Sequence, residues 1–129
     1  KTLHPKIFGG LLATNKRSHL KEMKSEGIVS FDILLVNLYP FEKTVNSTKD
    51  KSKIIEMIDI GGPSLLRAAG KNFKYITPII DIIDYKKLVT NLNKNNGSTD
   101  IIFRKKMAIK VFKQTAQYDK IISNWLNEK

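Results

Sequence analysis

The sequence contains no cysteine, one tryptophan and four prolines among its 129 residues. The absence of cysteine excludes disulfides, thiol catalysis and thiolate metal sites. No apolar run approaches the ~20 residues needed to span a bilayer, and a hydrophobic share of 41% is too high for a disordered tail. The chain opens with neither an initiator methionine nor an apolar signal segment. We therefore expect a single domain that is a cytoplasmic piece of a longer protein, with no membrane partner.

The formal charge of +11 comes from lysine, because the chain has 20 lysines and only three arginines. Proteins that read nucleic acids favour arginine, whose planar guanidinium pairs with guanine and phosphate. The lysines are also spread along the whole chain. This pattern favours a solvated surface over a nucleic-acid partner. A basic nucleic-acid-binding module stays as the non-enzymatic alternative, and it predicts steeply salt-dependent binding.

The spacing of apolar residues predicts an α/β fold. Two short, nearly continuous apolar runs are typical of buried parallel strands, and five segments have helical spacing. The predicted strands are residues 31–38 and 75–80, and the predicted helices are residues 4–24, with a weakness at Gly9-Gly10, 51–60, 64–71, 81–92 and 100–126. Two strands cannot make an independently stable sheet, so we expect the N-terminal strands to be missing.

Polar residues follow the first predicted strand, at the sheet edge where parallel folds place their ligands. Asn37 and Tyr39 stand there, and Asp59 precedes a Gly61-Gly62-Pro63 break that starts a helix. Free N–H groups at a helix start favour an anion or a developing oxyanion. Each residue also has a plain structural interpretation, since Asp59 suits a turn acceptor and Tyr39 a half-buried strand end.

Lysines add the cationic groups that proton transfer and oxyanion stabilisation need without a metal. Lys71 stands at the end of the same predicted helix, and Lys1 opens the chain. Any single lysine is solvated surface by default. His4 and His19 share no metal-ligand spacing, so we predict no metal site.

Taken together, the motifs are far more specific than any one residue. Five segments occur in a fixed order: Lys1-Thr2-Leu3-His4-Pro5, Asn37-Leu38-Tyr39-Pro40-Phe41, Ile58-Asp59-Ile60-Gly61-Gly62-Pro63, Asp84-Tyr85 and Thr115-Ala116-Gln117-Tyr118-Asp119. In this order they resemble the N-terminal domain of the AICAR transformylase/IMP cyclohydrolase family of bifunctional purine biosynthesis enzymes. The resemblance covers essentially the whole chain.

This resemblance implies a methylglyoxal-synthase-like three-layer fold with a mostly parallel sheet, truncated at its N-terminus, over residues 1–129. It implies the dehydrative closure of formyl-AICAR to IMP, with a purine nucleotide as substrate and no cofactor for this step. The family's transformylase domain, which uses 10-formyltetrahydrofolate, is absent. The full-length family protein is expected to be a homodimer, and this piece alone is expected to be inactive. Methylglyoxal synthase itself is the alternative enzyme.

The resemblance also implies site residues. Carried over onto this chain, the catalytic residues are Lys1, Tyr39, Asp59 and Lys71, and the substrate-binding residues are Thr2, Asn37, Leu38, Ile60, Gly61 and Gly62. We expect Asp59 and Lys71 to converge on one crevice beside Tyr39. The chain departs from the family at Phe8, where a histidine is usual, and at Gln114, where one is frequent.

Overall fold

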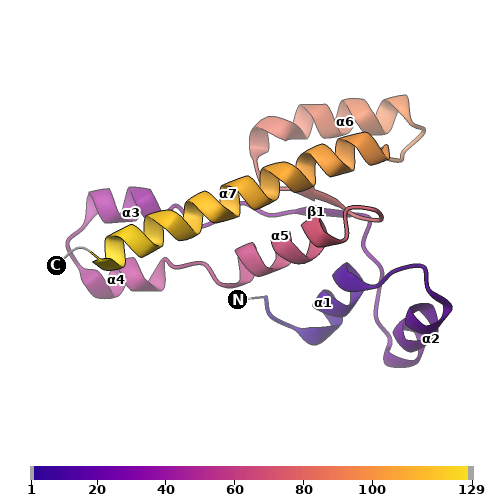
Figure 1. The fold of residues 1–129 in the computed structure, drawn as a ribbon, viewed down its shortest axis with the longest axis horizontal. Coiled ribbons are helices and arrows are strands. Elements are labelled where there is room, and N and C mark those ends of the chain that lie inside the picture. The colour runs from indigo at the N-terminus through magenta and orange to yellow at the C-terminus, as the bar shows by residue number, and fades with distance from the viewer. Residues whose placement is uncertain (1, 128–129) are drawn as a thin grey trace.

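The structure is a computed structural model that describes residues 2–127. Within that range the long C-terminal helix α7 runs the length of the molecule, with α6 along one half of it and α5 beside it (Figure 1). The helices are α1 (Pro5–Leu12), α2 (Arg17–Glu26), α3 (Phe41–Ser47), α4 (Lys51–Glu56), α5 (Gly61–Lys71), α6 (Tyr85–Lys94) and α7 (Ile101–Asn127), with a 3-10 turn at Ile82–Asp84. No described helix is long and apolar enough to cross a membrane.

A two-stranded parallel sheet lies at the centre of the molecule, as the two apolar runs predict. Strand β1 (Ile33–Leu35) pairs with β2 (Thr77–Ile79), with Leu34 opposite Pro78. The N–H of Thr77 points to β1, where it donates to Asp32 O at 2.8 Å. The nitrogen of Pro78 therefore faces away from β1, so its missing donor leaves the ladder intact. The α/β class with a small parallel sheet is confirmed.

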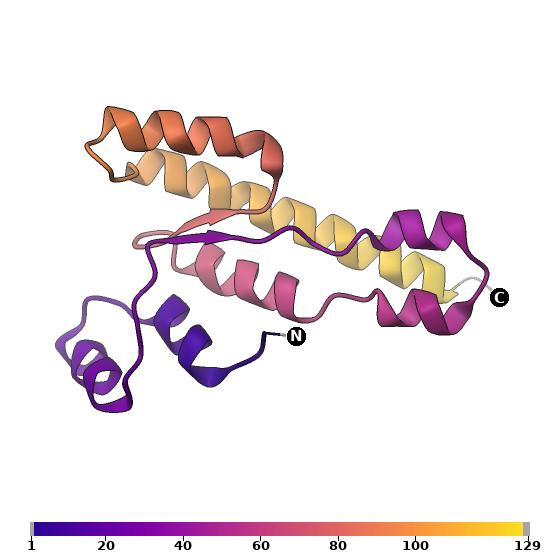
Figure 2. The ribbon, with the colours of Figure 1, turned by 180° about the vertical axis from the view of Figure 1, so that it is seen from behind.

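Apolar side chains cover one face of this sheet and, on the other face, the strand β2. Leu34 and Val36 pack with Leu66 of α5 and Val111 of α7, both fully buried. On the other side, the core cluster of Ile79, Leu88 and Met107 joins the sheet to α6 and α7. Seen from behind, the two strands lie in front of α5 and α7 (Figure 2). Helices α5 and α7 thus fix the strand ends, and hence the loops that follow them.

The N-terminal helix is shorter than its spacing predicts. The chain leaves the helix at Ala13 and starts α2 at Arg17, whereas one helix was expected over residues 4–24. The break does not fall at the glycine pair, because Gly10 is a contact point inside α1. A Cβ on Gly10 would lie 2.1 Å from the carbonyl oxygen of Val29. Glycine here lets the following segment approach the helix.

The start of α5 and the presence of α3 also differ from the predictions. Helix α5 begins at Gly61, three residues before the predicted start, so Pro63 occupies its third position. Proline fits there because first-turn N–H groups lack intrahelical partners. Helix α3 was not predicted at all; it begins at Phe41, which is buried against Ile54 and Tyr118. Tertiary packing of one aromatic ring, rather than periodicity, supports this short helix.

A buried ion pair ties the end of β2 to α7. The Asp84 carboxylate is 2% exposed and accepts hydrogen bonds from Lys87 and Lys110, and Lys110 also binds Asp81. Burial works to raise the pKa of Asp84, but the hydrogen bonds from Lys110 and Lys87 outweigh it and lower the pKa below the ordinary value of 3.8. Burial works to lower the pKa of Lys110, but its carboxylate partners raise it. The pair is therefore charged throughout the neutral range.

Lys110→Met is expected to lower the free energy of unfolding by about 2–4 kcal/mol, because Asp84 stays buried with only the exposed Lys87 as partner. Lys87→Met is the control and should cost less than about 1 kcal/mol. Since the pKa of Asp84 is lowered in the folded state, its contribution is complete above pH 3.8 and is lost as the pH falls below it. Urea unfolding should thus show a gap between wild type and Lys110→Met that closes in acid; an unchanged gap contradicts the assignment.

Candidate active site

Asp59 connects the loop after β1 to the start of α5. Its Oδ1 accepts the N–H of Gly62 at 2.8 Å, and its Oδ2 accepts the N–H of Tyr39 at 3.3 Å. The carboxylate therefore caps α5 from the position before Ile60, the N-cap residue. The plain interpretation of Asp59 as a turn acceptor is confirmed. The same contacts bring Asp59 and the backbone of Tyr39 together at one end of the sheet.

The two glycines at the start of α5 allow close approach from two sides. A Cβ on Gly62 would lie 2.5 Å from Asp59 Oδ2, and a Cβ on Gly61 would lie 3.3 Å from both the N and the O of Thr2. The backbone of Thr2 thus lies against the α5 start. Lys1, the first predicted catalytic residue, lies outside the described residues.

The free donors at this helix start differ from those expected. Asp59 already binds the N–H of Gly62, and Pro63 has no N–H. Among residues 2–127, the N–H groups of Ile60 and Gly61 have no hydrogen-bond partner; Ile60 is half exposed, whereas Gly61 is buried. Of the three predicted substrate-binding amides, Gly62 is instead a partner of the carboxylate.

Tyr118 anchors the same loop, and sequence reasoning assigned it no role. Its hydroxyl accepts the N–H of Asp59 at 2.9 Å and donates to the carbonyl of Met57 at 3.2 Å. Burial raises the pKa of Tyr118, although the Asp59 N–H works in the opposite direction. The residue stood in a motif of the resemblance, but the partner loop lies 59 residues away, so no local pattern points to the contact.

The residues after β1 lie at the carboxyl ends of both strands, as predicted. Asn37 donates from Nδ2 to Ile80 O at 3.2 Å and accepts at Oδ1 from the Tyr85 hydroxyl at 3.3 Å. Leu38 packs its half-buried side chain against the core. Tyr39 is 45% exposed. Thus Asn37, Tyr39, Asp59 and the α5 start share one end of the sheet.

Lys71 does not join this group within the chain. It is the last residue of α5, an 11-residue helix whose first residue is Gly61. At ~1.5 Å per residue, the two ends of α5 are about 15 Å apart. Lys71 and Asp59 therefore lie at opposite ends of one helix, and the expected convergence on a single crevice is wrong for one copy of the chain.

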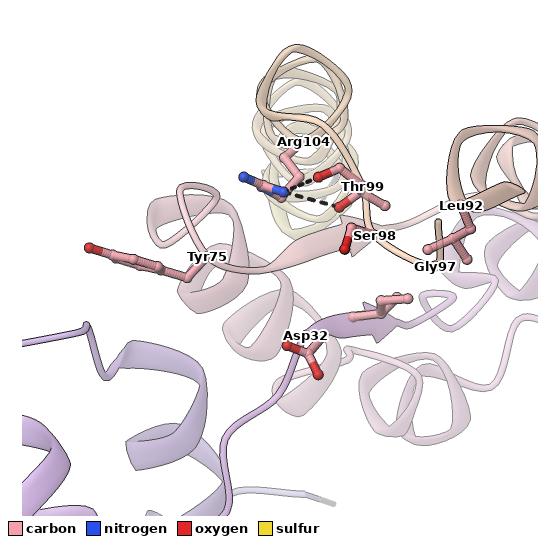
Figure 3. A pocket seen from close by; sticks show the side chains of 8 residues that line it. Asp32, Tyr75, Leu92, Gly97, Ser98, Thr99 and Arg104 are labelled. Atoms are coloured by element: carbon pink, nitrogen blue, oxygen red, sulfur yellow. Dashed lines mark hydrogen bonds between the residues drawn. The ribbon is translucent and has the colours of Figure 1, made fainter. Parts of the chain in front are cut away.

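A separate polar cavity lies at the amino ends of the strands and holds none of the predicted site residues. It has a volume of about 290 Å³ and includes Asp32, Tyr75, Ser98, Thr99 and Arg104 in its lining (Figure 3). The Arg104 guanidinium is occupied by the carbonyls of Phe73, Lys74 and Thr99. Arg104 thus holds the surrounding loops together. In parallel α/β folds ligands bind at the other end of the sheet, where Asp59 lies.

No cluster of three or more potential metal ligands occurs among the described residues. The polar groups at the carboxyl end are a carboxylate, backbone N–H groups and a phenol. They can orient and deprotonate a nitrogen nucleophile and bind a developing oxyanion.

Comparison with known proteins identifies relatives along the whole chain. The family model described as AICARFT/IMPCHase bienzyme matches residues 69–129. The bifunctional purine biosynthesis protein PurH of Persephonella marina is 49% identical over 100% of this chain, and that of Dinoroseobacter shibae is 46% identical over 99% of it. The chain is related to the bifunctional purine biosynthesis proteins. It spans about a quarter of their length, 25% and 24% respectively.

A solved structure has a similar fold. The crystal structure of ForH is 32% identical and superposes with a TM-score of 0.82, over 95% of this chain and 65% of that chain. The resemblance to the purine biosynthesis family, drawn from five motifs, is confirmed by the family model and the PurH relatives.

The two departures from the family motifs have structural counterparts. Phe8 packs its partly buried ring against the cluster around Leu11 and Leu65. Gln114 lines an open groove of about 270 Å³ beside Tyr118. Phe8 thus contributes to packing in this chain, and Gln114 belongs to the polar surroundings of the sheet end.

Gly62→Ala is expected to displace the Asp59 carboxylate, because the new Cβ would lie 2.5 Å from Oδ2. Loss of the cap should lower the free energy of unfolding by about 1–2 kcal/mol in denaturant titrations. Gly70→Ala, in the last turn of the same helix, is the matched control. Its Cβ would meet the half-exposed Phe112 ring at 3.2 Å, which can move, and Val111 Cγ1 at 3.4 Å, an ordinary van der Waals contact. Equal stability losses in both variants contradict the cap.

Proposed function

We propose that this chain carries the IMP cyclohydrolase step of a bifunctional purine biosynthesis enzyme, the last step of the de novo pathway. In this reaction the carboxamide nitrogen of formyl-AICAR attacks the formyl carbon, a C–N bond forms, and loss of water gives IMP. The observation that carries the proposal is the Asp59 carboxylate, held at the start of α5 beside two free N–H groups.

The chemistry of ring closure explains why this arrangement suits it. An amide nitrogen is a poor nucleophile, so a nearby carboxylate helps by accepting or orienting its proton. The formyl oxygen gains negative charge during the attack, and the N–H groups of Ile60 and Gly61 are positioned donors for such a charge. We propose that Asp59 accepts the proton that the attacking carboxamide nitrogen loses. The departing hydroxyl needs a proton, for which we propose the Lys1 ammonium.

Thr2, Asn37 and Tyr39 complete the proposed substrate site. The Thr2 backbone lies against Gly61, and Asn37 keeps one Nδ2 hydrogen beyond the one that binds Ile80. The backbone of Leu38 lies between Asn37 and Tyr39, and in this proposal it contacts the purine base of the substrate. Lys71 reaches the site only if a second copy of the chain brings it there, which fits the homodimer expected of the full-length protein.

We further propose that residues 1–129 are a methylglyoxal-synthase-like cyclohydrolase domain that lacks its N-terminal strands. Among the described residues, the edge of β1 opposite β2 pairs with no other strand, which supports this. Asp32 accepts a backbone hydrogen bond from Thr77, and Val36 donates one to Ile79. Because alternate residues of a strand bond the same neighbour, the backbone groups of Ile33 and Leu35 face away from β2. Leu35 is 46% exposed at this edge. An unpaired apolar edge is a ready template for a further strand.

The proposal also specifies cofactors, partners and location. The substrate is a purine nucleotide, and ring closure needs neither a metal nor an organic cofactor. The 10-formyltetrahydrofolate of the relatives' second activity belongs to a transformylase domain that residues 1–129 do not include. We place the enzyme in the cytoplasm, with neither nucleic acid nor membrane as a partner.

Asp59→Asn in the longer protein that contains this chain is expected to lower kcat for formyl-AICAR closure by about 10²–10⁴-fold, because the amide cannot accept the proton. Absorbance of the purine product measures the rate. Asp32→Asn is the matched control, since it removes an exposed carboxylate at the opposite end of the sheet. Full activity in Asp59→Asn, or an equal loss in Asp32→Asn, contradicts the proposal.

A further inference from the structure

One phenol connects α7 to the loop that carries Asp59. The Tyr118 hydroxyl accepts the N–H of Asp59 and donates to the carbonyl of Met57, so one oxygen satisfies two backbone groups of the same turn. Asp59 thereby has three fixed points: its N–H on Tyr118, Oδ1 on Gly62 and Oδ2 on Tyr39. Only the contact from Tyr118 comes from outside the two loops that form the site.

The ring of Tyr118 cannot easily leave this position. It packs edge-on against Phe41 with centroids 6.3 Å apart, and Phe41 packs in the same way on Trp125 at 5.7 Å. Phe41 is 1% exposed and directly follows Tyr39-Pro40, so the cluster holds both site loops. Fixed side chains of this kind hold neighbouring groups in place.

The protonation of Tyr118 fits the same role. The hydroxyl must keep its proton in order to donate to Met57, and burial raises the pKa of this phenol above its ordinary value of 10.0. It therefore stays a donor throughout the neutral range. A charged side chain at this position would add an electrostatic field at the Asp59 carboxylate. A neutral phenol holds the turn without adding such a field.

We infer that Tyr118 is a positioning residue for ring closure: it holds the Asp59 turn so that the carboxylate and the free N–H groups of α5 face the same substrate. This inference rests on the proposed function. Tyr118 itself touches no reacting atom, since its hydroxyl is occupied by Met57 and Asp59.

The test is Tyr118→Phe in the longer protein, which removes the hydroxyl and keeps the ring. A misplaced carboxylate is expected to lower kcat by about 10–100-fold with little change in KM. The change is then repeated in an Asp59→Asn background. If Tyr118 acts only through Asp59, the two substitutions are not additive. Tyr118→Phe should therefore cause no further loss of kcat in the Asp59→Asn background. Tyr75→Phe, a half-buried tyrosine at the other end of the sheet, is the control and should keep full activity.

Three results overturn the inference: unchanged kcat in Tyr118→Phe, a loss that appears equally in Tyr75→Phe, or the full loss again in the Asp59→Asn background. The last outcome would indicate general damage to the fold. Amide hydrogen exchange gives a readout that does not depend on activity. Tyr118→Phe should raise exchange at Gly62, whose N–H is held by Asp59, and should leave α6 unchanged.

The exchange measurement separates this inference from the proposed function. If the wild-type enzyme fails to close formyl-AICAR, the proposed function is wrong, and the exchange at Gly62 alone decides whether Tyr118 positions Asp59. Faster exchange in Tyr118→Phe supports the positioning, and unchanged exchange overturns it.

Discussion

The start of helix α5 presents backbone N–H groups that the helix itself cannot pair, and the site is organised around this constraint. Asp59 takes the N–H of Gly62 and also holds Tyr39, so the loops after β1 and before α5 are fixed together. The helix is buried along Leu66 and Ala69 between the sheet and α1. Its first turn therefore cannot move without disturbing the core.

Helix α7 stabilises this arrangement from the other side. Near its middle, Val111 packs on the sheet and Lys110 pairs with the buried Asp84. Two turns later Tyr118 binds the Asp59 turn. A single long helix thus connects the turn after β2 to the loop before α5.

Much of the architecture could be predicted from the sequence, because apolar runs and helical spacing are local signals. The parallel strands, the long last helix and the polar carboxyl edge with Asn37 and Asp59 are of this kind. Tyr118 could not be found in this way, since its partners depend on packing across 59 residues.

Lys71 shows the opposite error. The family resemblance led us to expect it beside Asp59, yet the intervening helix is rigid and separates the two residues. The start of α5 was also misplaced, because the Asp59 carboxylate accepts the N–H of Gly62 and so caps a helix that includes the two glycines. Family motifs indicated which residues matter, whereas the structure decides which of them meet in one chain.

The proposed function requires that a purine nucleotide binds at the start of α5. Hydrogen exchange of the longer protein, with and without IMP, measures this binding. We expect slower exchange at Tyr39, Ile60 and Gly61 on binding, with no change around Ser98 and Arg104. Protection confined to the Ser98 and Arg104 cavity, with Ile60 and Gly61 unaffected, would contradict it.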